Sequence, residues 1–443
     1  MTGLDQKSTL NKEPVVALVT TEFVPWCTKR FAEPILDVIQ GRAGDGLTDR
    51  LATYAVPSDW ALHKEEGLQQ KSRQEIRIIN ERRAFDGRSV TARGDVTSTS
   101  LAWSQIRPHL YSCDGQGVTV WRCTSDKLNE VRKFRLRKDN ALIEDEVTDL
   151  FVINEMTREL LMTCSEDGLM RIWDPGYSIH SYEFEDEHRM ITAAYLLRDT
   201  QLTTPAEKRI SSVYSWNQKR GLLAIAGNVK VCGLWDMHAE KCIQEIQIGA
   251  KNCAVTRLSI DNSSNELLAL GITGCQSIST RLSDGLVNMY DPRLPPRSRR
   301  TMSLRELEGP VVGLSLFSNV PGQSSEGVLR LVAGARNGEI HLWEPRMFKE
   351  PVASFNACNA TKGRKLTCME VHTHGQFIGC VDDGSAVRLF DIRGNQLSEL
   401  HQDEWLPGGR TGNLVSMRFH QLLVSFALST QAHTITVYRM PDL

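Results

Sequence analysis

The sequence predicts an all-β protein, a seven-bladed β-propeller preceded by an N-terminal extension that contains a short helix. Two regularities predict this fold. Seven times along the chain an aromatic residue ends a short apolar strand, at intervals of 47 to 62 residues. An Asp-Gly or Asn-Gly pair lies six or seven positions before five of these aromatic residues. Repeats of this kind, each too small to bury its own apolar face, are typical of blades that pack in a ring.

The clearest copy of the repeat is Ser165–Pro175, with the sequence SEDGLMRIWDP. Its Asp-Gly pair supplies the positive φ angles of a two-residue hairpin turn, and the alternating residues that follow form a strand. Trp173 then serves as a packing anchor, and the Trp-Asp pair is typical of a WD40-type blade. The anchors of the seven blades are Trp121, Trp173, Trp235, Tyr290, Trp343, Phe390 and Tyr438. The turn pairs are Asp114-Gly115, Asp167-Gly168, Asp284-Gly285, Asn337-Gly338 and Asp383-Gly384.

Each blade is predicted to have four strands. Two apolar strands precede the turn, as in VTDLFVI and LLMTC of the second unit, and a fourth follows the anchor in most units, as in SIHSYEF. Only five residues follow Tyr438, too few for a fourth strand in the last unit. We expect Arg88–Ala92 to supply it, because circular closure removes the exposed edges of the end blades. The predicted division is therefore an extension over residues 1–87 and a propeller over residues 88–443, closed by strand 88–92.

The extension lacks the repeat. Val24–Leu36 (VPWCTKRFAEPIL) combines aromatic, apolar and proline residues, which indicates an extended segment docked on a surface. Leu68–Phe85 has the composition of a helix but only a weak apolar stripe. Two interpretations of this helix stay open: a solvated helix that leads into the propeller, or a basic helix that binds a partner.

Several segments interrupt the regular repeat. The stretch Tyr182–Ile210 is longer than an ordinary blade connection, and long loops on rigid scaffolds often carry binding function. Gly274–Leu282 separates a strand from its turn and is interpreted either as an insertion that loops out of blade 4 or as an extension that comes from a splice variant or from the gene model. Asp291–Arg300 (DPRLPPRSRR) is either a solvated loop or a contact for an acidic partner. The candidate partner surface comprises Trp26, Phe31, Met190, Tyr195, Arg297, Arg299 and Arg300.

Composition and motifs argue against catalysis, metal binding and nucleic-acid binding. The net charge of −2 gives no field that attracts nucleic acid, and no apolar run is long enough to span a bilayer. The 11 cysteines show no zinc-ligand spacing and are predicted to be free thiols in a reducing compartment. His372 and His374 are interpreted as loop histidines. Because the common nucleotide-binding, hydrolase and zinc-protease motifs do not occur, we expect no catalytic residue, cofactor or metal.

The blades are expected to be held together by apolar packing. No Gly-His pair occurs in the sequence, so the hydrogen-bond network that joins Asp, His, Ser and Trp in many propellers is predicted to be missing. The tryptophan anchors should instead bury large areas between neighbouring blades. Replacing a fully packed anchor by alanine would then cost about 3–5 kcal/mol.

Several stretches resemble one family of propellers in particular. They are FVPWCTKRFAEPIL, MITAAYLLRDTQLTT followed by VYSW, GLLAIAGNVKVCGLWD, IQEIQIGAKNCAVTRLSIDN, SDGLVNMYDPRL and NGEIHLWEPRM. In content and order they resemble the C-terminal propeller of the raptor family, the scaffold subunits of target of rapamycin (TOR) complex 1. The stretches beginning GNVKV and IQIGA, which depart from the general repeat, carry most of this resemblance.

The resemblance implies a non-catalytic scaffold that supports nutrient-responsive TOR signalling and control of cell growth. Its implied partners are the TOR kinase and other subunits of the complex. Its implied location is the cytoplasm, with recruitment to the lysosomal surface through the complex. Family members also carry a caspase-like domain and a helical-repeat region, which these 443 residues lack, so substrate presentation is not transferred to this chain. The alternative is a WD40 adaptor of another class, such as a ubiquitin-ligase substrate receptor or a trafficking scaffold.

Overall fold

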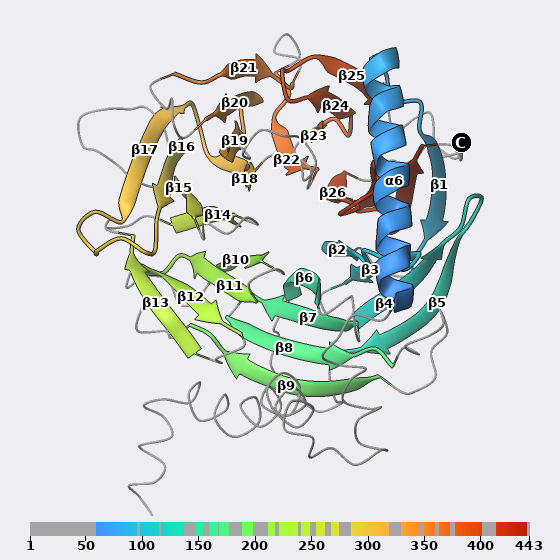
Figure 1. Cartoon of the computed structure of the whole chain (residues 1–443), viewed down its shortest axis with the longest axis horizontal. Helices are drawn as coiled ribbons and strands as arrows, with labels where there is room; N and C mark the ends of the chain where they lie inside the picture. Colours follow the sequence, from blue (N-terminus) through green and yellow to red (C-terminus); the bar gives the residue numbers. More distant parts are fainter. Residues whose placement is uncertain are drawn as a thin grey trace, which may run out of the picture.

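Seven antiparallel four-stranded sheets form the blades of a closed ring in the computed structural model (Figure 1). This architecture confirms the predicted seven-bladed propeller. The structure describes residues 59–94, 98–114, 117–136, 147–153, 159–166, 168–176, 188–197, 211–217, 221–237, 241–248, 254–261, 267–273, 285–318, 329–344, 350–358, 363–372, 377–400 and 413–440. The predicted docked segment Val24–Leu36 lies outside these ranges.

The first three blades run from the inner to the outer strand in chain order. Blade 1 consists of β2 (Ser100–Trp103), β3 (His109–Cys113), β4 (Gly117–Cys123) and β5 (Leu128–Arg135). Blade 2 consists of β6 (Val147–Ile153), β7 (Leu160–Ser165), β8 (Leu169–Asp174) and β9 (Arg189–Tyr195). Blade 3 consists of β10 (Ser212–Asn217), β11 (Leu222–Gly227), β12 (Val231–Asp236) and β13 (Lys241–Gln247).

The next three blades repeat this order. Blade 4 consists of β14 (Ala254–Ile260), β15 (Leu268–Thr273), β16 (Gly285–Tyr290) and β17 (Arg300–Leu307). Blade 5 consists of β18 (Val311–Ser318), β19 (Leu329–Ala335), β20 (Glu339–Trp343) and β21 (Ala353–Asn356). Blade 6 consists of β22 (Leu366–Val371), β23 (Phe377–Asp382), β24 (Val387–Asp391) and β25 (Gln396–Leu400).

Blade 7 combines strands from both parts of the chain. Its inner strands are β26 (Leu414–Phe419), β27 (Ser425–Thr430) and β28 (Thr434–Arg439), and its outer strand is β1 (Arg88–Arg93). β1 pairs antiparallel with β28, from Arg88 opposite Arg439 to Arg93 opposite Thr434. The hydroxyl groups of Thr91 and Thr436 lie 3.0 Å apart across this pair. The ring is thus closed by main-chain hydrogen bonds between residues far apart in the sequence.

The outer strand of blade 2 differs from the prediction. The predicted strand SIHSYEF lies outside the described residues, and the strand that pairs with β8 is β9, with Met190 opposite Trp173. Part of the stretch interpreted as a long loop is therefore a strand. Two short segments after Trp173 could form this strand, SIHSYEF and Arg189–Tyr195. The β-branched residues Ile191 and Thr192 favour a strand in the second segment. Buried Ala194 on β9 packs in the core between blades 2 and 3.

The suspected insertion in blade 4 falls where the structure describes nothing. β15 ends at Thr273 and β16 begins at Gly285, and residues 274–284 are outside the described ranges. The interpretation of Gly274–Leu282 as an inserted loop therefore stays a prediction.

Each aromatic anchor packs against the preceding blade. Trp173 of blade 2 lies in a cluster with Val118 and Val120 of blade 1, and fully buried Trp343 of blade 5 lies with Val287 of blade 4. The relation holds around the ring, since Trp121 of blade 1 packs with strands of blade 7. Apolar burial contributes about 25 cal/mol per Å² removed from water, so these contacts stabilise the packing of neighbouring blades.

Two tryptophan anchors donate hydrogen bonds to hydroxyl groups on neighbouring strands. Bonds of this type were not expected, because the sequence has no Gly-His pair. The indole Nε1 of Trp121 donates to Ser112 Oγ at 2.8 Å, and that of Trp173 donates to Thr163 Oγ1 at 3.0 Å. The expectation that the network is missing was therefore wrong for its indole–hydroxyl half. The indole needs only a serine or threonine on the neighbouring strand. The presence or absence of a Gly-His pair does not indicate whether such a residue is there.

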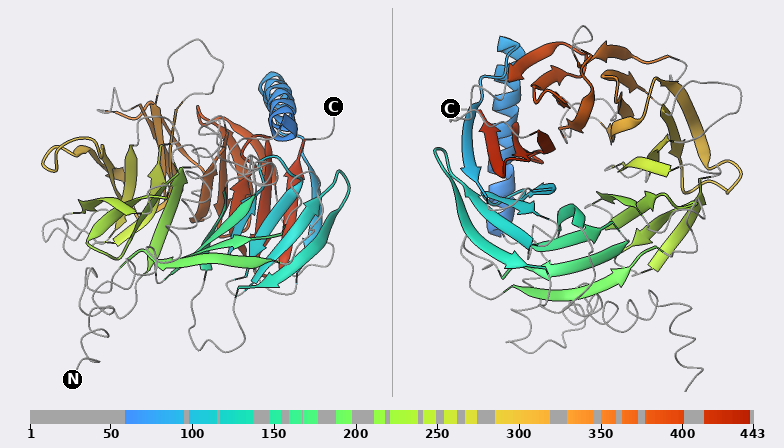
Figure 2. Two further views of the ribbon diagram at one scale, coloured as in Figure 1. Left: turned by 60° about the horizontal axis from the view of Figure 1, so that its bottom comes forward. Right: turned by 180° about the vertical axis from the view of Figure 1, so that it is seen from behind.

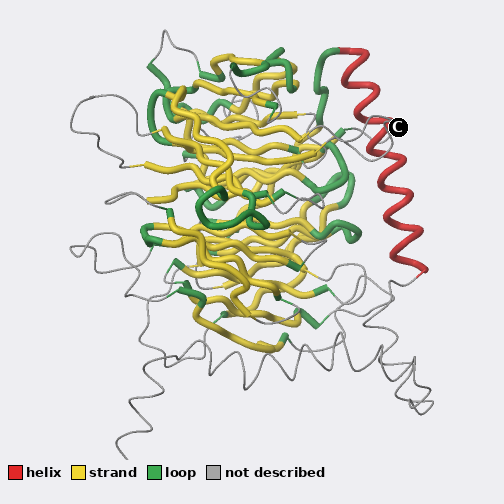
Figure 3. The backbone as a smooth tube through the Cα atoms, turned by 60° about the vertical axis from the view of Figure 1, so that its left-hand side comes forward, coloured by secondary structure: helices red, strands yellow, loops and turns green. Residues whose placement is uncertain are grey.

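A single helix in the described residues, α6 (Asp59–Arg82), lies on one face of the ring, outside the stack of strands (Figures 2 and 3). It begins nine residues before the predicted Leu68–Phe85. Its Ile79 is fully buried in the core cluster that contains Phe426 of blade 7. The Glu75 carboxylate accepts a 3.0 Å hydrogen bond from the Val424 amide. The helix is therefore docked along one face rather than solvated all round.

Candidate functional site

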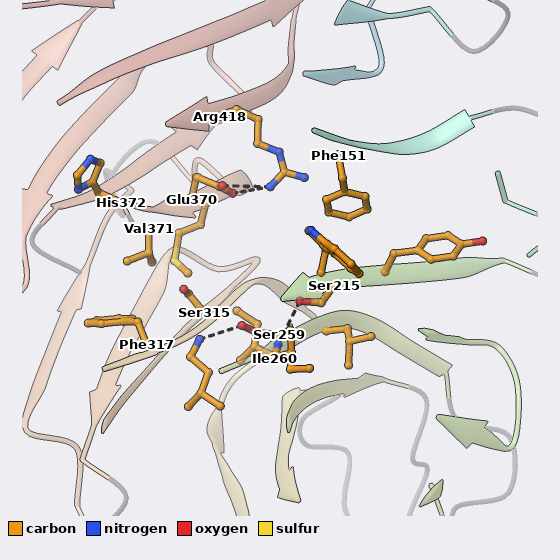
Figure 4. A pocket seen from close by; sticks show the side chains of 16 residues that line it. Phe151, Ser215, Ser259, Ile260, Ser315, Phe317, Glu370, Val371, His372 and Arg418 are labelled. Carbon is orange, nitrogen blue, oxygen red and sulfur yellow. Dashed lines mark hydrogen bonds and ion pairs between the residues drawn. The ribbon is translucent and has the colours of Figure 1, made fainter. Parts of the chain in front are cut away.

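The inner strands of blades 2 to 7 surround a central cavity of about 240 Å³ (Figure 4). Its wall mixes aromatic, hydroxyl and charged side chains. Six of the lining residues are Phe151, Ser215, Ser259, Ser315, Glu370 and Arg418. Each of these blades contributes between one and four residues to the wall.

A charged triad crosses the cavity wall. The Arg418 guanidinium lies 3.0 and 3.2 Å from the two oxygens of Glu370, and 3.7 Å from Asp149. It thereby links blades 7, 6 and 2. The Glu370 charge is the main cause that raises the pKa of Arg418, while burial raises the pKa of Asp149 against the opposing effect of Arg418. The three side chains are 21–32% exposed, so solvent screens part of this attraction.

Two serines of the wall connect neighbouring blades. Ser215 Oγ of blade 3 accepts a 3.1 Å hydrogen bond from the Ile260 amide of blade 4, and Ser259 Oγ accepts a 2.9 Å bond from the Leu316 amide of blade 5. A serine nucleophile needs a base within hydrogen-bond reach. Neither hydroxyl contacts a histidine or carboxylate in the part of the chain that the structure describes. These serines therefore position blades.

The histidine next to the cavity is also structural. His372 is fully buried, and its Nε2 lies 3.1 Å from the Leu423 carbonyl oxygen of blade 7. His374, the other histidine of the pair, lies outside the described residues. Among the residues that the structure describes, no group of three or more His, Cys, Asp and Glu could hold a metal ion. The cavity offers a surface for polar and aromatic contacts.

The predicted partner residues that the structure describes lie on two separate blades. Met190 is 47% exposed on β9 of blade 2, and Tyr195 lies on the same strand, opposite Leu169. Arg297, Arg299 and Arg300 lie two blades away, at the connection between β16 and β17 and at the start of β17, with Arg299 Nε donating to the Leu294 carbonyl at 3.0 Å. Blade 3 lies between the two groups (Figure 1). Trp26 and Phe31 are outside the described residues.

The blade turns use several geometries. Gly168 and Gly338 have φ values of 87° and 94°, as their turns require, and Asp114 Oδ1 accepts a 2.6 Å bond from the Gly117 amide. In blade 6 the positive φ, 61°, belongs to Ser385, next to the predicted pair Asp383-Gly384. Gly285 is the first residue of β16. Gly115, Asp167 and Asp284 are outside the described residues.

One feature near α6 was missed at the sequence level. Lys64 and Lys71 of the helix, Arg107 of blade 1 and Arg439 of blade 7 line a second cavity, of about 200 Å³. The helix, Arg107 and Arg439 are far apart in the sequence. Only the seven-residue spacing of the two lysines, which places them on one side of a helix, could have indicated part of it.

No helix in the described ranges is long and apolar enough to cross a membrane.

Comparison with known proteins identifies relatives. No protein-family model matches the chain. It is 28% identical over 284 residues to the target of rapamycin complex 1 subunit mip1 of Schizosaccharomyces pombe, which covers 64% of this chain and 19% of the relative. It is 33% identical over 243 residues to the complex 1 subunit KOG1 of Saccharomyces cerevisiae, covering 52% of this chain and 14% of the relative. A raptor homolog of Dictyostelium discoideum is 19% identical over 427 residues, covering 94% and 25%.

The fold has a solved counterpart. The crystal structure of Chaetomium thermophilum Raptor superimposes with a TM-score of 0.66 at 21% sequence identity, covering 84% of this chain and 31% of that one. This likeness shows the shared fold. Together with the sequence matches it confirms the predicted resemblance to raptor. The chain spans a quarter or less of the length of the three relatives above.

Proposed function

We propose, from the resemblance of this chain to raptor-type subunits, that it is a non-catalytic scaffold that supports nutrient-responsive TOR signalling and control of cell growth. The observation that carries the proposal is its sequence similarity to two fungal proteins named as subunits of target of rapamycin complex 1. The similarity covers 64% and 52% of this chain.

The described structure suits a scaffold. The ring is closed by β1, its blades are joined by buried anchors, and the polar groups of its central cavity are used in contacts between blades. A closed propeller of this kind offers two faces and a rim whose shape changes little on binding. We propose that the chain is not an enzyme, which fits relatives that are named as subunits of a complex.

The partners that follow are proteins: the TOR kinase and further subunits of its complex. The proposed location is the cytoplasm, with recruitment to the lysosomal surface through the complex. The proposed contact residues are those on the rim of blades 2 and 4, namely Met190, Tyr195, Arg297, Arg299 and Arg300. An exposed apolar side chain and a cluster of arginines are of the types that protein interfaces favour.

The test is affinity purification of the tagged full chain from cells, with the co-purified proteins identified by mass spectrometry. We expect the TOR kinase or another subunit of its complex. Met190→Asp and the pair Arg297→Glu with Arg299→Glu should each reduce this recovery. Val352→Asp is the matched control, because Val352 is 52% exposed just before β21 of blade 5.

Thermal unfolding checks that each variant is folded. A folded chain that recovers no subunit of the complex, or that recovers cullin adaptors or coat components instead, contradicts the proposal. If both rim variants recover the subunits of the complex fully, the contact lies elsewhere on the ring.

A further inference from the structure

The cavity beneath α6 is built from three separate parts of the fold. The helix contributes Lys64, Leu68 and Lys71, the β2–β3 turn of blade 1 contributes Arg107, and β28 of blade 7 contributes Arg439. The helix crosses blade 7 and the neighbouring strands of blade 1 (Figures 1 and 2). The cavity therefore lies at the seam where the ring is closed.

The two lysines lie on the side of the helix that faces the propeller. Lys64, Leu68 and Lys71 are spaced by four and three residues, which places them on one stripe that continues to buried Glu75. Both lysines are half-buried, although lysine is mostly exposed in proteins. Both residues line the cavity.

Arg439 adds a third positive charge. One of its Nη atoms donates to the Thr124 carbonyl oxygen. Its Nε is buried and has no hydrogen-bond partner among the described residues. A buried guanidinium N–H without an acceptor is unfavourable, and an anionic ligand would satisfy it.

Two carboxylates lie at or next to the cavity: Glu75, which lines it, and Glu159. Glu75 accepts the Val424 amide at 3.0 Å, and Glu159 lies 3.5 Å from Arg107. His420 adds no charge, because burial lowers its pKa to about 3. Its Nδ1 accepts the amides of Leu422 and Leu423, each at 3.1 Å. Counted against the four cations that line the cavity, Lys64, Lys71, Arg107 and Arg439, the two carboxylates Glu75 and Glu159 leave an excess of two positive charges.

Most of the remaining wall is apolar, formed by side chains such as Leu68, Trp103, Ile106, Val437 and Met440, and His420 and Ser425 also line it. Its volume of about 200 Å³ is somewhat larger than the roughly 150 Å³ of a dry cavity that holds benzene. A group the size of one ring or a short alkyl chain would therefore fit beside the cations.

We propose that this cavity binds a small organic anion, in which one carboxylate or phosphate group is attached to a single ring or a short apolar chain. The anionic group pairs with Lys64, Lys71 and Arg439, and the apolar part lies against Leu68 and Ile106. Such a ligand contacts both the helix and blade 7. It therefore strengthens the docking of α6 by mass action, since it binds only when the two are together.

The test uses the full chain and isothermal titration calorimetry with phenyl phosphate and benzoate as probes. We expect saturable binding of at least one of them, and much weaker binding of inorganic phosphate and of neutral benzyl alcohol. The double variant Lys64→Gln with Lys71→Gln should weaken binding about tenfold or more, because it removes two charge-assisted contacts. Lys127→Gln with Lys241→Gln, at two positions outside the cavity, is the matched control.

Loss of the helix from the ring could imitate this result. Lys64→Arg with Lys71→Arg keeps the charge and should keep the binding, and hydrogen exchange of the α6 amides reports whether the glutamine variant remains docked. The proposal is overturned if neither probe binds, if inorganic phosphate binds as tightly as phenyl phosphate, or if a docked glutamine variant binds as the original chain does.

Discussion

The indole N–H of Trp103 on β2 donates a 3.1 Å hydrogen bond to the carbonyl oxygen of Arg418 on β26, across 315 residues of sequence. It joins blade 1 to blade 7 at the inner edge of the ring. Ser429 Oγ makes a second bond of this kind, 2.9 Å long, to the Ser98 carbonyl. The ring is therefore closed at its inner strands by side chains, and at its rim by the pairing of β1 with β28.

Removing the Trp103 bond should loosen the closure. Trp103→Phe keeps an aromatic ring but leaves the Arg418 carbonyl without this donor, so we expect a loss of about 1–3 kcal/mol in the free energy of unfolding. Urea unfolding followed by circular dichroism measures it. Trp235→Phe is the control, because the Trp235 indole N–H has no hydrogen-bond partner among the described residues. Equal losses in both variants would show that the bond adds nothing.

The anchors should differ in their contribution to stability according to their burial. Trp343 is 0% exposed, and Trp343→Ala should cost about 3–5 kcal/mol. Trp235 is only partly buried, so Trp235→Ala should cost less. Thermal and urea unfolding of the two variants give the comparison. A larger loss at Trp235 would contradict the idea that these residues act mainly through burial.

His420 should make the protein sensitive to acid. Burial lowers its pKa to about 3 from an unfolded value near 6.5, so below pH 6.5 the unfolded chain takes up a proton that the folded chain does not. Stability from this group is present above pH 6.5 and is lost as the pH falls, by about 1.4 kcal/mol per unit. His420→Asn keeps an acceptor for the Leu422 and Leu423 amides. Its unfolding free energy should fall less steeply between pH 6.5 and 5, and an unchanged slope would refute this origin.

Glu159 should have the opposite effect. It is fully buried, accepts hydrogen bonds from Ser104 Oγ at 2.5 Å and from the Tyr111 hydroxyl, and burial raises its pKa. The folded chain therefore holds this proton to a higher pH than the unfolded chain, so its contribution to stability falls as the pH rises above the unfolded value near 4.3. In the Glu159→Gln variant, the free energy of unfolding should no longer show this decrease with rising pH. Urea unfolding at several pH values from 4 to 7 provides the measurement.

Docking of the helix should depend on Ile79. This side chain is 0% exposed in the cluster with Phe426, and Ile79→Ala should cost about 2–5 kcal/mol locally. We expect faster hydrogen exchange of the α6 amides and little change in blades 3 to 5, because the core cluster that contains Ile79 is otherwise built from blades 6 and 7 and from the segment after α6. Leu62→Ala, at a 43% exposed position of the same helix, serves as the control. Uniformly faster exchange would instead indicate that the helix is part of the cooperative unit of the ring.

Local sequence signals predicted much of the fold. A turn pair and an aromatic residue lie within a few positions of each other in the sequence. Their spacing therefore predicted most of the blades. The signals failed where two nearby segments had similar patterns. The outer strand of blade 2 is Arg189–Tyr195, and in the described structure its Ala194 packs in the core between blades 2 and 3. The position of this strand therefore depends on contacts with the neighbouring blade. The Trp121–Ser112 bond was missed because its two residues lie on adjacent strands.

The amino-acid sequence by itself determined the number of blades, because turn chemistry, strand alternation and repeat length are properties of short segments. It also contained the resemblance to raptor. Only the tertiary structure decided which distant residues meet. Arg418 lies between Asp149 and Glu370, and Lys64 lies over the same cavity as Arg439, because closure of the ring and docking of α6 bring these segments together. No local pattern specifies such distances, since they depend on packing of the whole ring.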